Sequence, residues 1–76
     1  MSRPEKHSVT LRGHRTSISL EPEFWVAFRQ IARTRNLSTN ALVSIVDEGR
    51  SPDTGLASAI RVYVLNAALR GDETLS

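Results

Sequence analysis

The side chains best suited to binding chemistry alternate along one short stretch, between residues 15 and 20. Arg15, Ser17 and Ser19 carry hydrogen-bonding groups, whereas Ile18 and Leu20 are apolar. Successive side chains of a β-strand point to opposite faces, so this alternation predicts a strand with one polar face and one apolar face. The polar face is suited to contact a hydrogen-bonding partner, and the apolar face to cover a core.

The basic residues are concentrated in the N-terminal half of the chain. The formal net charge of the whole chain is only +2. Residues 1–20 nevertheless carry four basic side chains, Arg3, Lys6, Arg12 and Arg15, against one acidic side chain, Glu5. A second basic cluster follows in the next fifteen residues and consists of Arg29, Arg33 and Arg35. This asymmetry favours an anionic partner. Ordinary solvated charge gives the same pattern, so charge by itself does not decide the function.

The chain lacks the residue groupings that catalysis and metal binding require. It contains no cysteine, and its two histidines, His7 and His14, are seven residues apart in a non-helical region. No histidine–carboxylate pair is placed near the serines, and there is no glycine-rich phosphate loop. We therefore expect no enzymatic activity, no metal and no cofactor.

The length of the chain points to oligomerisation. Seventy-six residues form at most one domain, and a domain of about this size is marginal unless disulfides, a metal or a second subunit support it. No apolar run approaches the roughly 20 residues of a membrane span, and the N-terminus lacks the apolar region of a secretory signal. We expect a cytoplasmic homo-oligomer without membrane contact.

Three helices are expected after the strand. Proline suits a first helical turn, so Pro22 marks the start of a helix over residues 22–35, with Asn36 as a left-handed cap. Ser38 is the expected N-cap of a helix over residues 38–47. A third helix is expected over residues 54–70, closed by Gly71. Residues 1–7 are expected to be a flexible basic arm, residues 8–70 the domain and residues 71–76 a tail.

The segment before the strand has two interpretations. Val9 and Leu11 alternate with polar residues, and Gly13-His14 follows. Residues 8–12 can form the first strand of a hairpin whose two-residue turn is Gly13-His14. They can also be a looser extension before a single strand at residues 15–20.

A single strand requires a partner. Its backbone N–H and C=O groups would be unpaired, at a cost of about 1–3 kcal/mol for each buried group. Pairing the strand with its copy in a second chain gives an antiparallel two-stranded ribbon with Ile18 and Leu20 on the core side. Such a ribbon fits the major groove of B-DNA.

The sequence also resembles a known family. The run from Arg15 to Trp25, RTSISLEPEFW, and the turn from Arg35 to Leu42, RNLSTNAL, resemble ribbon-helix-helix proteins of the Arc and MetJ class. The segments GHRTS and AIRVYVL are similar to a bacterial subgroup with an extra C-terminal helix. The resemblance covers residues 8–70. It implies a mainly α-helical fold with a short β-ribbon, and an intertwined homodimer whose two-stranded sheet is intermolecular.

The resemblance also implies roles for individual residues. Arg15, Ser17 and Ser19 would contact base edges, and Ser38, Thr39 and Asn40 would bind phosphate at the start of the second helix. Arg12 and His14, which precede the strand, would bind phosphates of the DNA backbone or extend the contact with the groove. The expected dimer core is Ile18, Leu20, Phe24, Phe28, Leu42 and Ile45. Trp25 and Phe28 are expected in the core or dimer interface rather than stacked on bases.

Two functions follow from these observations. The first is a DNA-binding transcription regulator, in particular a repressor, that reads double-stranded DNA as a homodimer. The second is an antitoxin-like or adaptor module that binds another protein through its third helix. The apolar stripe of Leu56, Ile60, Val64 and Ala67 distinguishes the two, because an exposed stripe favours the adaptor.

Overall fold

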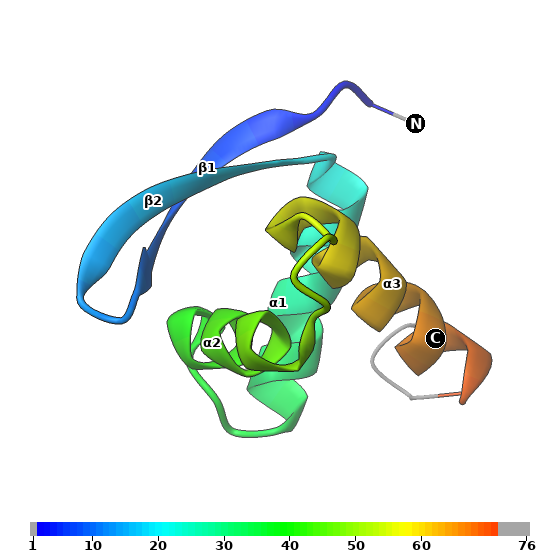
Figure 1. Ribbon diagram of the computed structural model, residues 1–76. Coiled ribbons are helices and arrows are strands. Elements are labelled where there is room, and N and C mark those ends of the chain that lie inside the picture. The colour runs from blue at the N-terminus through cyan, green and yellow to red at the C-terminus, as the bar shows by residue number, and fades with distance from the viewer. Residues whose placement is uncertain (1, 72–76) are drawn as a thin grey trace.

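The computed structural model describes residues 2–71, which fold into a β-hairpin followed by three α-helices. The elements are β1 (Glu5–Leu11), β2 (His14–Leu20), α1 (Pro22–Thr34), α2 (Thr39–Gly49) and α3 (Leu56–Leu69). The twisted hairpin lies on one side of the three helices, and its tip projects beyond them (Figure 1). The expected class, mainly helical with a short β-ribbon, is confirmed.

Residues 8–11 belong to the first strand of a hairpin, and Arg12 lies in its turn. β1 pairs antiparallel with β2 from Leu11 opposite His14 to Glu5 opposite Leu20. The turn is Arg12-Gly13, where both residues have positive φ, 52° and 78°. Two central residues with positive φ define a type I′ turn, whose twist matches that of the flanking strands. The hairpin interpretation is therefore correct, but its turn lies one residue earlier than Gly13-His14.

The hairpin changes two expectations about the N-terminal region. β2 is not a single strand, because β1 of the same chain pairs with one of its edges. The two-stranded sheet of the structure is formed within one chain, and the pairing of β2 with its copy in a second chain stays a prediction. Residues 5–7, expected in a flexible arm, lie within β1.

The boundaries of α1 follow the sequence signals. Pro22 is the first residue of the helix, and Glu23 lies in its first turn. At the other end Asn36 has φ 59°, and the Leu37 N–H donates to the Ala32 carbonyl at 2.9 Å. These are the features of a helix closed by a left-handed residue, as expected for Asn36.

The boundaries of α2 and α3 differ by about two residues from those expected. Ser38 caps α2 as predicted, but the helix continues to Gly49 rather than ending at Asp47. α3 begins at Leu56 rather than at residue 54, because Thr54 belongs to a turn in which its N–H donates to the Ser51 carbonyl. Within residues 2–71 no helix has the length and apolar character needed to cross a membrane.

A single chain forms one apolar core between the hairpin and the helices. Its buried side chains are Val9, Ile18, Leu20, Phe28, Ile31, Ala32, Leu42, Val43, Val46, Ile60, Val64 and Ala67. In α2 the core side is Leu42, Val43 and Val46, whereas Ile45, expected in the dimer core, is 50% exposed in the single chain. The core therefore holds β2 with its polar side chains directed outward.

Candidate nucleic-acid interface

The outward face of the hairpin is entirely polar. Ile18 and Leu20 of β2 and Val9 of β1 are buried against the helices. The strand register places three polar pairs on the opposite face: Lys6 with Ser19, Ser8 with Ser17 and Thr10 with Arg15. All six side chains are exposed. The face thus carries two cations, four hydroxyls and no carboxylate, a combination suited to hydrogen-bonding and anionic partners.

Half of this face was missed by the sequence reasoning. Arg15, Ser17 and Ser19 were expected there, and the structure brings them together on β2. Lys6, Ser8 and Thr10 of β1 were not expected there, because Lys6 was assigned to an arm and residues 8–12 were left open between a strand and a looser extension. The signal was present, since Lys6, Ser8 and Thr10 alternate with residues of the opposite face at the period of a strand.

Within residues 2–71 no strand pairs with the second edge of β2, which is called the open edge below. The Thr10 N–H donates to Asn40 Oδ1 at 3.1 Å rather than to β2, so Thr10 and Arg15 form a non-hydrogen-bonded pair. Such pairs alternate with hydrogen-bonded pairs in an antiparallel ladder. The backbone groups of Arg15, Ser17 and Ser19 therefore point away from β1, toward the open edge.

Arg61 of α3 lies beside one end of this open edge. Its guanidinium donates to both carboxylate oxygens of Glu21, at 2.8 and 3.2 Å, and approaches the Ser19 carbonyl at 3.5 Å. These side-chain hydrogen bonds are the largest cause that lowers the pKa of Glu21 below its ordinary value, followed by a bond from the Glu21 backbone. The pair fixes the junction between β2 and α1.

The start of α2 adjoins the other edge of the hairpin. Ser38 Oγ accepts the Ala41 N–H at 3.0 Å, as an N-cap does. The Asn40 side chain holds the edge of β1 through the Thr10 N–H. Of the three residues at the start of α2 that were expected to bind phosphate, Ser38 and Asn40 already make side-chain hydrogen bonds. The Thr39 side chain makes none within residues 2–71.

Arg12 is bound within the chain. Its guanidinium pairs with Asp47 of α2, whose side chain is only 3% exposed. Arg50 Nε donates to the other oxygen of the same carboxylate at 2.8 Å. Arg12 therefore anchors the hairpin tip to α2, a role that sequence reasoning did not predict. His14, beside the turn, is exposed.

The aromatic side chains pack inside the chain. Phe28 is fully buried. The Trp25 ring stacks on His7 of β1 with 4.2 Å between centroids, and Tyr63 meets Phe28 edge to face at 6.1 Å. Neither Trp25 nor Phe28 belongs to the outward face, so base stacking by these rings has no structural support.

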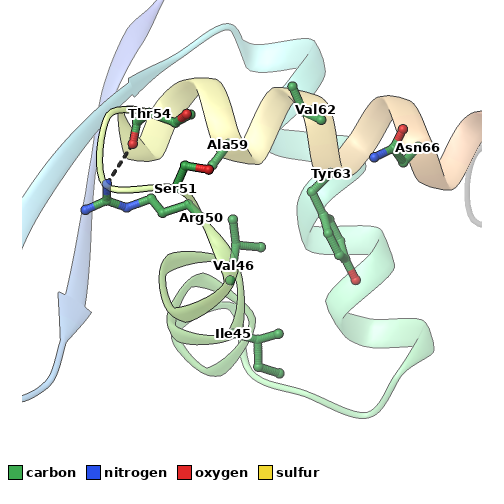
Figure 2. A pocket seen from close by; sticks show the side chains of 10 residues that line it. Ile45, Val46, Arg50, Ser51, Thr54, Ala59, Val62, Tyr63 and Asn66 are labelled. Carbon is green, nitrogen blue, oxygen red and sulfur yellow. Dashed lines mark hydrogen bonds between the residues drawn. The ribbon is translucent and has the colours of Figure 1, made fainter.

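An apolar groove of about 470 Å³ lies between α2 and α3. Its walls include Ile45 and Val46 of α2, with Ala59, Val62 and Tyr63 of α3 (Figure 2). The loop between the helices closes one end, where Arg50 donates to the Thr54 carbonyl at 2.6 Å. About half of the surface of each of two lining residues is exposed, 50% for Ile45 and 54% for Val62.

The apolar stripe of α3 is buried within one chain. Ile60, Val64 and Ala67 pack into the core, and Leu56 is partly buried. The opposite side of the helix exposes Val62, Leu65 and Leu69. Within residues 2–71 no group of three or more histidine, aspartate or glutamate side chains is arranged to hold a metal ion.

A hairpin with one polar face and one buried face, carried on a helical core, defines a small β-ribbon domain. The family model described as the ribbon-helix-helix domain matches residues 4–68. The chain therefore belongs to the ribbon-helix-helix family, whose fold is a DNA-binding fold and whose domains dimerise. Comparison with curated proteins and with solved structures gave no significant match.

Proposed function

We propose that this protein is a transcription regulator, in particular a repressor, that reads the major groove of DNA with the outward face of β2. Ribbon-helix-helix domains are typically those of DNA-binding transcription regulators or antitoxins. The observation that carries the proposal is the position of Arg15, Ser17 and Ser19, which are exposed together while Ile18 and Leu20 anchor the strand in the core.

Each side chain of this row has a defined capacity for base contacts. The Arg15 guanidinium can donate two hydrogen bonds to guanine, and serine hydroxyls match either donors or acceptors. Sequence discrimination therefore depends mostly on Arg15. Each well-formed bidentate contact contributes about 1–3 kcal/mol of discrimination against the wrong base.

The homodimer is proposed to form through the open edge of β2. Antiparallel pairing of β2 with its copy would satisfy the outward backbone groups of Arg15 and Ser17, together with the Ser19 N–H, and extend the two-stranded hairpin to a four-stranded sheet. The polar rows of both chains would then be neighbours on one face. Ile45 and Val62 are half exposed in one chain. A second copy would cover both side chains, which agrees with the prediction that Ile45 belongs to the dimer core.

Phosphate binding is proposed at the start of α2, where the free N–H groups and the helix dipole attract anions. Ser38 and Thr39 are the side chains that support it. Arg12 and Asn40 are less suitable, because Asp47 and the Thr10 N–H already bind them. His14 remains available beside the turn.

Selection of genomic DNA fragments on the purified protein, followed by sequencing, tests this function. The selected duplex and a random duplex are then titrated with wild type, Arg15→Ala and Arg29→Ala. Arg29 is an exposed arginine of α1 and serves as the charge-matched control. We expect Arg15→Ala to lose at least tenfold more affinity for the selected duplex than for the random one. Equal losses on both duplexes would remove Arg15 from base reading.

The adaptor alternative has lost its original support, because the stripe Ile60, Val64 and Ala67 is buried within the chain. A different observation keeps an antitoxin-like module as the second candidate. The exposed side of α3 carries Val62, Leu65 and Leu69. Replacing Leu65 with aspartate is expected to leave DNA binding unchanged if the regulator proposal is correct, as a fluorescence anisotropy titration would show.

A further inference from the structure

We infer that β1 is a phosphate-binding strand that flanks the reading strand, with Lys6 as its principal cation. The inference rests on the proposed function and assigns to β1 a role distinct from that of β2. It starts from the register, which places Lys6, Ser8 and Thr10 in a row parallel to Ser19, Ser17 and Arg15 on the same exposed face.

The width of the sheet separates the two rows. In the proposed dimer the strand order would be β1, β2, β2 of the copy and β1 of the copy. Neighbouring strands lie about 4.8 Å apart. Each β2 would therefore lie roughly 2.4 Å from the twofold axis, and each β1 roughly 7 Å from it. The major groove is about 12 Å wide, or about 6 Å on each side of its centre. The β2 rows therefore face the base edges, while the β1 rows face the walls, where the phosphates run.

The chemistry of the β1 row suits phosphates. Lys6 is a compact positive charge, which binds phosphate without the planar geometry that favours arginine at guanine. Ser8 and Thr10 add hydroxyl donors in the same row. The Glu21 carboxylate at the cap of α1 is paired with Arg61, and Glu23 of α1 accepts hydrogen bonds from Ser2.

A second observation places the start of α2 on the same flank. The hydrogen bond from the Thr10 N–H to Asn40 Oδ1 joins the edge of β1 to the first turn of α2. A DNA strand that passes along β1 would therefore also meet the first turn of this helix, whose N–H groups favour anions. The two features form one continuous phosphate track beside the reading face.

The test exploits the fact that Lys6 is the single lysine of the sequence. Association constants are measured against salt concentration for wild type, Lys6→Ala, Lys6→Arg and the control Arg29→Ala, on the selected duplex and on a random one. A dimer loses two phosphate contacts in Lys6→Ala, so the slope of log K against log salt should fall in magnitude by about 1.8. Affinity should fall roughly tenfold or more on both duplexes alike, and Lys6→Arg should restore it. Urea unfolding confirms that each variant is folded.

A second measurement needs no substitution. Lys6 of the wild-type protein is acetylated with an amine-reactive reagent in the presence and absence of duplex, and its modification is followed by mass spectrometry. DNA should slow the acetylation of Lys6.

Three outcomes would overturn the inference. The first is an unchanged salt slope in Lys6→Ala, the second a loss confined to the selected duplex, and the third an unprotected Lys6. A wild-type protein that binds neither duplex would reject the proposed function itself, and that result is distinguishable from the other three.

Discussion

Asp47 is the residue on which the position of the hairpin tip depends most. Its carboxylate is almost completely buried and accepts hydrogen bonds from Arg12 of the turn and Arg50 of the following loop. Arg12 itself is 66% exposed. If the pair were broken, water could hydrogen-bond the exposed Arg12 guanidinium. The buried Asp47 carboxylate would have no water to replace the hydrogen bonds that it lost.

Asp47→Asn should accordingly destabilise the fold. The amide retains the shape but loses the charge that both guanidinium groups require, so we expect a loss of about 1–3 kcal/mol in the free energy of unfolding. Urea denaturation followed by circular dichroism measures it. Glu48→Gln, at the exposed next position of α2, is the control and should change stability by no more than about 0.5 kcal/mol. Equal effects of the two substitutions would contradict the role of Asp47.

Glu21 links stability to pH. Its pKa is lowered in the folded state, chiefly by hydrogen bonds from Arg61, so its contribution is fully present above the ordinary glutamate pKa of about 4.3. The contribution is lost as the pH falls through the lower, folded-state pKa. Glu23, whose pKa is lowered by its own backbone N–H and then by Ser2, contributes with the same sign.

The stability advantage of wild type over Glu21→Gln should therefore shrink as the pH falls below about 4.3. Thermal unfolding of both proteins between neutral and acidic pH measures this difference. Arg61→Gln should remove the same part of the pH dependence. Parallel curves for wild type and Glu21→Gln would show that the pair does not act on stability.

At the scale of the element, the hairpin turn depends on glycine. Gly13 has φ 78°, and a Cβ added there would meet no atom within 4 Å. The cost of Gly13→Ala is therefore that of the left-handed backbone, about 1–2 kcal/mol. Gly49, at the end of α2, has no positive φ and also has open space around it. Gly49→Ala should stabilise the protein by up to about 1 kcal/mol. Chemical denaturation measures the free energy of unfolding of both variants. If both substitutions changed it in the same direction, the different roles given to Gly13 and Gly49 would be contradicted.

How far sequence predicts this fold depends on the element. Pro22, Asn36 and Ser38 carry strong local signals, and the structure confirms the role of each. The turn was placed one residue late because Arg-Gly lacks the Asn or Asp that usually marks a type I′ turn. In α2 tertiary packing buries Val43 in the core of one chain, and Ile45, predicted in the dimer core, is half exposed there. The role of Ile45 in a dimer stays a prediction.

The candidate site was predictable only in part. Alternation revealed Arg15, Ser17 and Ser19, because the contrast with Ile18 and Leu20 is strong. The row on β1 is less evident, since Val9 is the one fully buried apolar residue of that strand. The contacts of Arg12 with Asp47 and of Asn40 with Thr10 join residues 35 and 30 positions apart. Such distant pairs follow from tertiary packing, which no local pattern encodes.

At the scale of the whole molecule, the proposed dimer would cover Ile45 and Val62, which are half exposed in one chain. Ile45→Asp should weaken the dimer at least tenfold, because it places a charge in the proposed interface. The side chain is half exposed in one chain, so the fold itself should persist. Val26 on α1, with a similar exposure of 53%, is the matched control. Sedimentation equilibrium at micromolar concentration tests both variants. A wild-type protein that sediments as a folded monomer would contradict the dimer, and equal effects of the two variants would contradict the position of the interface.

The most direct test of the reading face is to map the backbone amides that DNA perturbs. The selected duplex is titrated into isotopically labelled protein, and amide chemical shifts are followed by NMR. We expect the largest changes at Arg15, Ser17 and Ser19, smaller ones along β1 and at the start of α2, and little change at Leu65 and Leu69 of α3. Large changes confined to α3, with the hairpin unperturbed, would contradict the claim that β2 reads DNA.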